Sequence, residues 1–182
     1  MNVAQKILSG RTHLISSSLS YSTNAQNMFT LNTLENTVGS GAITNDGTMY
    51  VGTWDSEFYA LNTTTGSIIW KYNTGKYITS SPLIGKDATV IVGCGDGKIY
   101  AFSPTGSVVW TFDTKKAIVS SPVFSKDSRT FYIGSGDGSV YAIDSYHGHM
   151  IWNTSTEGAI LASPALSNEG DVLYVIILYH DY

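Results

Sequence analysis

The sequence predicts an all-β protein: a partial β-propeller made of four-stranded antiparallel blades. Three observations lead to this prediction. Landmark residues recur about every 41 residues, and each copy contains short apolar segments separated by turn residues. No long segment shows the 3.6-residue periodicity of an amphipathic helix. Repeats of about 40 residues with four strands each are typical of propeller blades.

Four kinds of residue mark the repeat. Glycines recur at a spacing of 41, at Gly52, Gly93 and Gly134. Aspartates keep the same spacing, at Asp55, Asp96 and Asp137. Tryptophans follow at spacings of 40 and 42, at Trp70, Trp110 and Trp152. Ser-Pro pairs follow at the same spacings of 40 and 42, at 81–82, 121–122 and 163–164, and open the copies. Because four landmarks share one period, they identify a structural array.

The repeat sets the expected domain boundaries. Residues 28–43 align without gaps on a later copy of the unit, and the pattern ends at residue 175. We therefore expect a divergent or disordered segment over 1–27, a propeller over 28–175 and a truncated tail over 176–182. This propeller would contain three complete blades, the outer strand of a preceding blade and the first two strands of a following one.

The middle copy illustrates the four strands of a unit. Its strand segments read SSPLIG, TVIVG, KIYAF and SVVWTFD. The dipeptide Asp96-Gly97 joins the second to the third and favours a type I′ hairpin, which needs positive φ at both central residues. The middle strands are apolar at nearly every position, whereas a strand with one solvated face would alternate. Blades stacked face to face explain this pattern.

The composition argues against nucleic-acid binding, a transmembrane segment and an internal disulfide. The net charge is −4 and charged residues are 13% of the chain, which argues against binding a nucleic-acid backbone. No run of 18 apolar residues is present, so no transmembrane segment is expected. Cys94 is the only cysteine and excludes an internal disulfide. No clear signal peptide is visible, and the compartment stays open.

The third and fourth strands carry a more specific motif. Residues 60–70 read ALNTTTGSIIW, residues 142–152 read AIDSYHGHMIW, and residues 101–110 read AFSPTGSVVW. These segments resemble the A-x-D-x-x-T-G-x-x-x-W tryptophan-docking motif of pyrroloquinoline-quinone (PQQ) repeat propellers. The resemblance covers about residues 28–175 and implies that each tryptophan staples neighbouring blades. The resemblance implies that the structural docking residues are Ala60, Gly66, Trp70, Ala101, Gly106, Trp110, Ala142, Gly148 and Trp152.

Two function classes share such repeats. Quinoprotein alcohol dehydrogenases hold PQQ and calcium at the propeller centre. Non-enzymatic propellers include the outer-membrane protein-assembly lipoprotein and the lumenal sensor domain of an unfolded-protein-response kinase. The sequence departs from the enzymes, which carry an adjacent-cysteine disulfide, and has no lipobox cysteine after a signal. We expect a non-catalytic scaffold without cofactor that binds protein or peptide; the alternative is an inactive fragment of a PQQ-dependent dehydrogenase.

One face of the propeller is the candidate interaction rim. In a four-stranded meander, the second-to-third-strand hairpins and the loops between blades lie on the same face. The hairpins place three aspartates there, Asp55, Asp96 and Asp137, which either attract a cation or basic partner or simply form the turns. The other rim candidates are Trp54, which stands where later copies have glycine, and the loop residues Tyr77, Lys115 and Lys116.

Other chemistry is weakly supported. The G-x-G-D-G runs precede a strand rather than a helix, so they indicate turns and not a phosphate cradle. His147 and His149 have no cluster of further ligands at metal spacing. An open propeller segment exposes the faces of its end blades. We therefore expect a fragment, a truncated product, or a chain that associates with itself or with a second chain.

Overall fold

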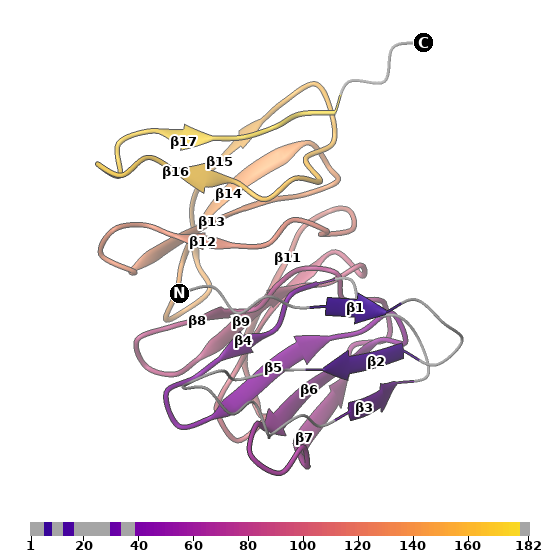
Figure 1. Cartoon of the computed structure of the whole chain (residues 1–182). Helices are drawn as coiled ribbons and strands as arrows, with labels where there is room; N and C mark the ends of the chain where they lie inside the picture. The colour runs from indigo at the N-terminus through magenta and orange to yellow at the C-terminus, as the bar shows by residue number, and fades with distance from the viewer. Residues whose placement is uncertain (1–5, 9–12, 17–29, 34–38, 179–182) are drawn as a thin grey trace.

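The computed structural model describes residues 6–8, 13–16, 30–33 and 39–178. The described elements are all β-strands, and Figure 1 shows the sheets following one another along the chain. Blade 1 consists of β4 (Ala42–Ile43), β5 (Thr48–Gly52), β6 (Glu57–Asn62) and β7 (Ile68–Asn73). Blade 2 consists of β8 (Leu83–Ile84), β9 (Val90–Gly93), β10 (Lys98–Phe102) and β11 (Val108–Asp113). Blade 3 consists of β12 (Val123–Phe124), β13 (Thr130–Gly134), β14 (Ser139–Asp144) and β15 (Met150–Ser155).

Each blade is an antiparallel meander with its strands in sequence order. The predicted fold class, an all-β partial propeller with three complete blades, is confirmed. A two-stranded sheet follows blade 3, formed by β16 (Ala165–Leu166) and β17 (Leu173–Tyr174). These are the expected first two strands of a further blade. The described residues contain no helix that could cross a membrane.

The N-terminal sheet has more strands than expected. The predicted outer strand of a preceding blade is β3 (Thr30–Thr33), and it pairs with β2 (His13–Ser16), which pairs with β1 (Lys6–Leu8). The two extra strands lie in the segment expected to be divergent or disordered, whose other residues lie outside the described ones. Their short segments KIL and HLIS carry none of the repeat's landmarks, so the sequence pattern did not predict them.

The C-terminal geometry also extends beyond the sequence pattern. The amide of Leu178 donates to the carbonyl of Ala159 at 3.1 Å. The equivalent bonds of earlier blades run from Gly95 to Tyr77 at 2.9 Å and from Gly136 to Ala117 at 3.0 Å. The backbone therefore keeps the propeller repeat to residue 178, three residues into the expected tail. These hydrogen bonds need only main-chain atoms, which explains why side-chain landmarks missed them.

The second-to-third-strand hairpins use a different turn from the predicted type I′. In blade 2 the amide of Gly97 donates to the carbonyl of Cys94 at 3.1 Å, and only Gly97, with φ of 90°, has positive φ. Asp96 is therefore the second central residue of an ordinary turn, followed by a left-handed glycine that forms a bulge. In blade 1 the left-handed position is taken by Ser56, with φ of 71°. The aspartate therefore contributes to the turn through the hydrogen bonds of its side chain, and it does not need a positive φ.

Stacking of adjacent blades forms the core, as the continuous apolar strands predicted. One buried cluster joins Tyr50 and Phe58 of blade 1 to Tyr100 and Phe102 of blade 2. A second cluster joins the opposite face of blade 2 to Phe131 and its neighbours in blade 3. Fully burying one such side chain contributes roughly 1.5–3 kcal/mol, so these interfaces dominate the stability of the array.

The tryptophans close each interface on its outer side. In every blade the tryptophan pairs across the strands with the alanine of the motif, for example Ala60 with Trp70. Trp70 then packs on the third-to-fourth-strand turn of blade 2, where a Cβ added at Gly106 would lie 2.8 Å from the indole. Trp110 packs in the same way on Gly148 of blade 3, at 2.5 Å. Only glycine allows this close approach, and both glycines have positive φ.

The two indoles differ in their hydrogen bonding. The indole N–H of Trp70 donates to the carbonyl of Pro104 at 2.8 Å. The indole N–H of Trp110 is buried and has no acceptor among the described residues. The turn that contains Pro104 is one residue shorter than the one before Gly148, which places its carbonyl differently.

Serine bonds tie the inner strands of the blades together. The amide of Ser40 donates to the hydroxyl of Ser81 at 3.0 Å, and the amide of Ser81 donates to the hydroxyl of Ser121 at 2.8 Å. The amide of Ser121 continues the series to Ser163 at 2.9 Å. Each bond contributes about 0.5–1.5 kcal/mol net, so the Ser-Pro landmark is an interblade contact as well as a strand start.

We predict that Trp70→Phe destabilises the protein more than Trp110→Phe. Both changes remove similar apolar area, but only the first removes a satisfied hydrogen bond, worth about 1 kcal/mol. Urea unfolding of the two variants measures the difference. Equal losses, or a larger loss for Trp110→Phe, would contradict the assigned hydrogen bonds.

Candidate interaction rim

The structure brings the hairpins and the interblade loops together on one face. The loop after β7 is fixed to its own blade by the bond from the Ile78 amide to the Thr53 carbonyl, at 2.9 Å. The same loop accepts from the Gly95 amide of blade 2 at 2.9 Å. The hairpins and the interblade loop therefore lie side by side, as predicted. The loop between blades 1 and 2 is hydrogen-bonded to both blades.

An aromatic pair stands on this rim between blades 1 and 2. The rings of Trp54 and Tyr77 stack with centroids 4.9 Å apart and planes 26° apart. Trp54 remains 46% exposed. A Cβ added at Gly95 would lie 2.7 Å from the Tyr77 ring, so the glycine of blade 2 provides the space for the tyrosine. At the next joint the corresponding loop residue is Ala117, so that joint has no such pair.

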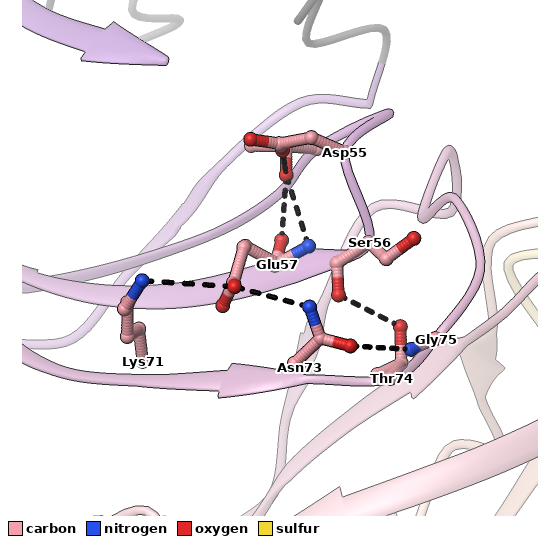
Figure 2. Close-up of polar contacts among 8 residues, drawn as sticks. Asp55, Ser56, Glu57, Lys71, Asn73, Thr74 and Gly75 are labelled. Atoms are coloured by element: carbon pink, nitrogen blue, oxygen red, sulfur yellow. Dashed lines mark hydrogen bonds and ion pairs between the residues drawn. The ribbon is translucent and has the colours of Figure 1, made fainter. Parts of the chain in front are cut away.

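Polar side-chain bonds hold the hairpin between β5 and β6 to the end of β7 in blade 1 (Figure 2). Glu57 accepts from Asn73 at 3.1 Å and lies 3.6 Å from the ammonium group of Lys71. The Thr74 hydroxyl donates to the carbonyl of Ser56 at 3.1 Å. These bonds join the hairpin that carries Trp54 to the end of β7, which leads into the loop of Tyr77. The segments that carry the two rings are therefore joined to each other by side-chain bonds.

The rim aspartates are engaged in their own hairpins. Asp96 accepts from the Tyr100 hydroxyl at 2.7 Å and from the Lys98 amide at 2.9 Å. Asp137 accepts from the Tyr141 hydroxyl at 2.7 Å, from the Ser139 amide at 2.8 Å, and weakly from the Lys115 amide. Asp55 accepts from the hydroxyl of Thr53. These bonds favour the turn-forming interpretation of the aspartates over cation attraction.

The ionisation of Asp137 and Tyr141 follows from their shared bond. Burial opposes ionisation of Asp137, but the hydrogen bonds from Tyr141 and the Ser139 amide outweigh it and lower its pKa. Burial and the bond to Asp137 raise the pKa of Tyr141 to about 12. The described residues contain no group of three or more His, Cys, Asp or Glu side chains that could hold a metal ion.

Three lysines are exposed in the two loops that join blades 1, 2 and 3. Lys115 and Lys116, in the loop between blades 2 and 3, are exposed as predicted for a rim position. Lys76, beside Tyr77 in the preceding loop, is exposed as well. Lys76 was not among the predicted rim residues, although its alignment with Lys116 in the repeat indicates the same position.

The histidines of the third blade have a turn role. Asp144 accepts from the amides of Tyr146 and His147 at 3.1 and 2.7 Å, and its side chain lies 3.0 Å from the His147 ring nitrogen. The rings of His147 and His149 stack at 6.0 Å. These contacts shape the turn that presents Gly148 to Trp110.

A family model described as outer membrane protein assembly factor BamB matches residues 25–103 and 95–176. The chain belongs to this PQQ-like repeat family of β-propellers. No curated protein sequence gives a significant match.

Two solved structures place the BamB-like fold among known propellers. The crystal structure of BamB from Moraxella catarrhalis superposes with a TM-score of 0.72 at 23% identity, over 94% of this chain and 54% of that one. Quinohemoprotein alcohol dehydrogenase from Comamonas testosteroni gives a TM-score of 0.67 at 20% identity, over 78% of this chain and 29% of that one. The chain thus spans about half the length of the BamB structure.

The single cysteine of this BamB-like chain lies in the interior. Cys94 is fully buried in the cluster between blades 1 and 2. Burial raises the pKa of its thiol to about 11. It occupies the position of Thr53 and Ser135 in the other blades, so a small side chain packs at this position in each blade.

We predict that Cys94 makes folding sensitive to alkaline pH. Since its folded pKa lies above the ordinary thiol value of about 8.5, the unfolded chain loses the thiol proton first as pH rises. The contribution of the protonated thiol is present below pH of about 8.5 and is lost as pH rises toward 11. Urea unfolding across this window should show a steeper loss for the wild type than for Cys94→Ala. Parallel curves would contradict the raised pKa.

Proposed function

We propose that this protein is a non-catalytic scaffold that binds a protein or peptide partner through the rim around Trp54 and Tyr77. The observation that carries the proposal is the aromatic pair, in which the exposed Trp54 stacks on the half-buried Tyr77 of a loop that is hydrogen-bonded to both blades. Aromatic side chains on a fixed base are the usual hot spots of protein interfaces, because their area is buried with little loss of side-chain freedom. Exposed lysines in the neighbouring loops would form the polar rim of such an interface around Trp54.

The family supports the same role. Its description names an outer membrane protein assembly factor, and a BamB structure shares the fold of nearly the whole chain. An assembly factor acts through contacts with other proteins. We propose that this chain does so without a cofactor.

The alternative is an inactive piece of a PQQ-dependent alcohol dehydrogenase. The likeness to the quinohemoprotein dehydrogenase favours it. A calcium-dependent quinone site needs a cluster of acidic ligands, and the described residues do not provide a group of three. Cys94 has no second cysteine with which to form the adjacent-cysteine disulfide. Within the described part of the chain, these two observations favour the scaffold over the dehydrogenase fragment.

The scaffold proposal is tested by site-specific photo-crosslinking in the native host. A photoreactive amino acid at position 54 should give a discrete cross-linked protein band, and the band should be lost when Tyr77→Ala is added. The matched control places the same group at Thr64, an exposed turn residue of blade 1. No band at position 54, or the same band from position 64, would contradict a rim-specific interface.

A calorimetric titration separates the two candidates. We expect no heat of binding when PQQ and calcium are added to the purified protein. Saturable binding at micromolar affinity would instead support the dehydrogenase alternative.

A further inference from the structure

A lysine crosses from one blade to the next at two joints of the array. The ammonium group of Lys86, in the turn between β8 and β9, donates to the main-chain carbonyl of Asp127 in blade 3 at 2.9 Å. The ammonium group of Lys126, in the turn between β12 and β13, donates to the carbonyl of Glu169 at 3.4 Å. The two lysines are 40 residues apart (126 − 86), so this lysine bridge belongs to the repeat. In an antiparallel meander these turns lie on the face opposite the rim.

The joint between blades 1 and 2 has the acceptor of this bridge but not the lysine. Asn45 stands at the aligned position in the turn between β4 and β5, and its shorter side chain carries no charge. The carbonyl of Asp87 corresponds to that of Asp127 and has no hydrogen-bond donor among the described residues. The two acceptor turns share one conformation, because the next residue is left-handed in both, with φ of 62° at Ala88 and 63° at Ser128. The Asp87 carbonyl is therefore presented toward blade 1.

A cavity of about 440 Å³ lies at this joint and is lined by both turns. Ile43, Ile84 and Pro104 give it apolar walls. Tyr50 lines it as well, and its ring is fixed by packing at 5.7 Å from the Trp70 ring. The volume lies within the range of small-ligand sites, about 300–1,000 Å³. The cavity is therefore formed by fixed parts of two blades and has room for a long side chain.

The polar lining of the cavity suits a cation. The Asp46 carboxylate accepts from the Thr44 hydroxyl and from the Thr48 amide, the latter at 3.2 Å. The hydrogen bond from Thr44 lowers the pKa of Asp46, so this carboxyl is charged at neutral pH. Lys86 also lines the cavity, but its ammonium group is bound to blade 3. Asp46 forms no ion pair with another described residue, so its charge is available to a ligand.

We propose that this cavity, the Asn45 cavity, binds the side chain of a lysine presented by a partner protein. The alkyl stem packs between the apolar walls, and the ammonium group donates to the Asp87 carbonyl and to the Asp46 carboxylate. Continuity with the two bridged joints identifies the occupant, because there a lysine of the chain itself makes the equivalent bond. The site lies on the face opposite the rim, so the inference does not depend on the scaffold proposal above.

The probe is a capped lysine, Nα-acetyl-lysine N-methylamide, titrated into the full chain labelled with nitrogen-15. We expect saturable shifts of the amide signals of Asn45, Asp46 and Ala88. The matched control ligand is the capped norleucine, which has the same four-carbon stem without the ammonium group. It should bind about tenfold more weakly or worse, because it cannot donate to the two oxygens. A third ligand, 1-aminopentane, separates a protein side chain from a free amine as the natural occupant.

Reciprocal variants test the argument from the repeat. Asn45→Lys restores the bridge and should abolish binding, because the ammonium group of the chain itself then reaches the Asp87 carbonyl. Lys86→Asn removes the bridge at the next joint and should add a second set of saturable shifts, at Asp127 and Ser128. Asp46→Asn keeps the size of the side chain and should weaken binding about tenfold. Circular dichroism confirms that each variant is folded.

Four results would overturn the proposal: no saturable shifts, equal affinity for the lysine and norleucine ligands, unchanged binding to Asn45→Lys, or binding of 1-aminopentane tenfold tighter than that of the capped lysine. The last result would assign the cavity to a free amine. Trp54→Ala on the rim should leave the affinity for the capped lysine unchanged, so this test succeeds or fails apart from the scaffold proposal.

Discussion

The contact between an indole and a glycine of the next blade is the constraint on which the array depends. A four-stranded sheet with two apolar faces has no stable existence alone, because both faces need cover. Stacking supplies that cover, and the tryptophan determines how the outer strands meet. Its partner must lack a side chain, since a Cβ at Gly106 or Gly148 would lie well inside contact distance of the ring. The glycine and the tryptophan of the motif are therefore kept together because the glycine of one blade receives the tryptophan of the blade before it.

The rim hairpins of the three blades share one feature and differ in another. The aspartate of each rim hairpin accepts hydrogen bonds from amides or hydroxyls of its own hairpin, so these carboxylates have partners within the blade. Where blade 1 departs from the repeat, it places Trp54 against Tyr77 at a joint that Gly95 leaves open. A departure from the repeat that leaves an indole nearly half exposed is where an interaction function is best sought.

The sequence predicted the blades well because their landmarks are side chains with strict local needs. Glycine spacing, the Asp-Gly hairpins and the tryptophan motif located the twelve strands of the three blades. The strands β1 and β2, and the repeat geometry up to Leu178, were missed because main-chain bonds alone define them. The turn type at Asp96 was wrong because a type I′ turn and a glycine bulge share the same dipeptide. The stacking of Trp54 on Tyr77 joins residues 23 apart (77 − 54) on separate loops, and no local pattern encodes it.

The central claim is that a docked indole holds adjacent blades together, and urea unfolding of two matched variants tests it most directly. Trp110→Ala removes a docked indole, whereas Trp152→Ala removes one that is 41% exposed. The account predicts a loss of about 3 kcal/mol or more in the free energy of unfolding for Trp110→Ala, and a clearly smaller loss for Trp152→Ala. Equal losses, or a Trp110→Ala protein as stable as the wild type, would contradict it.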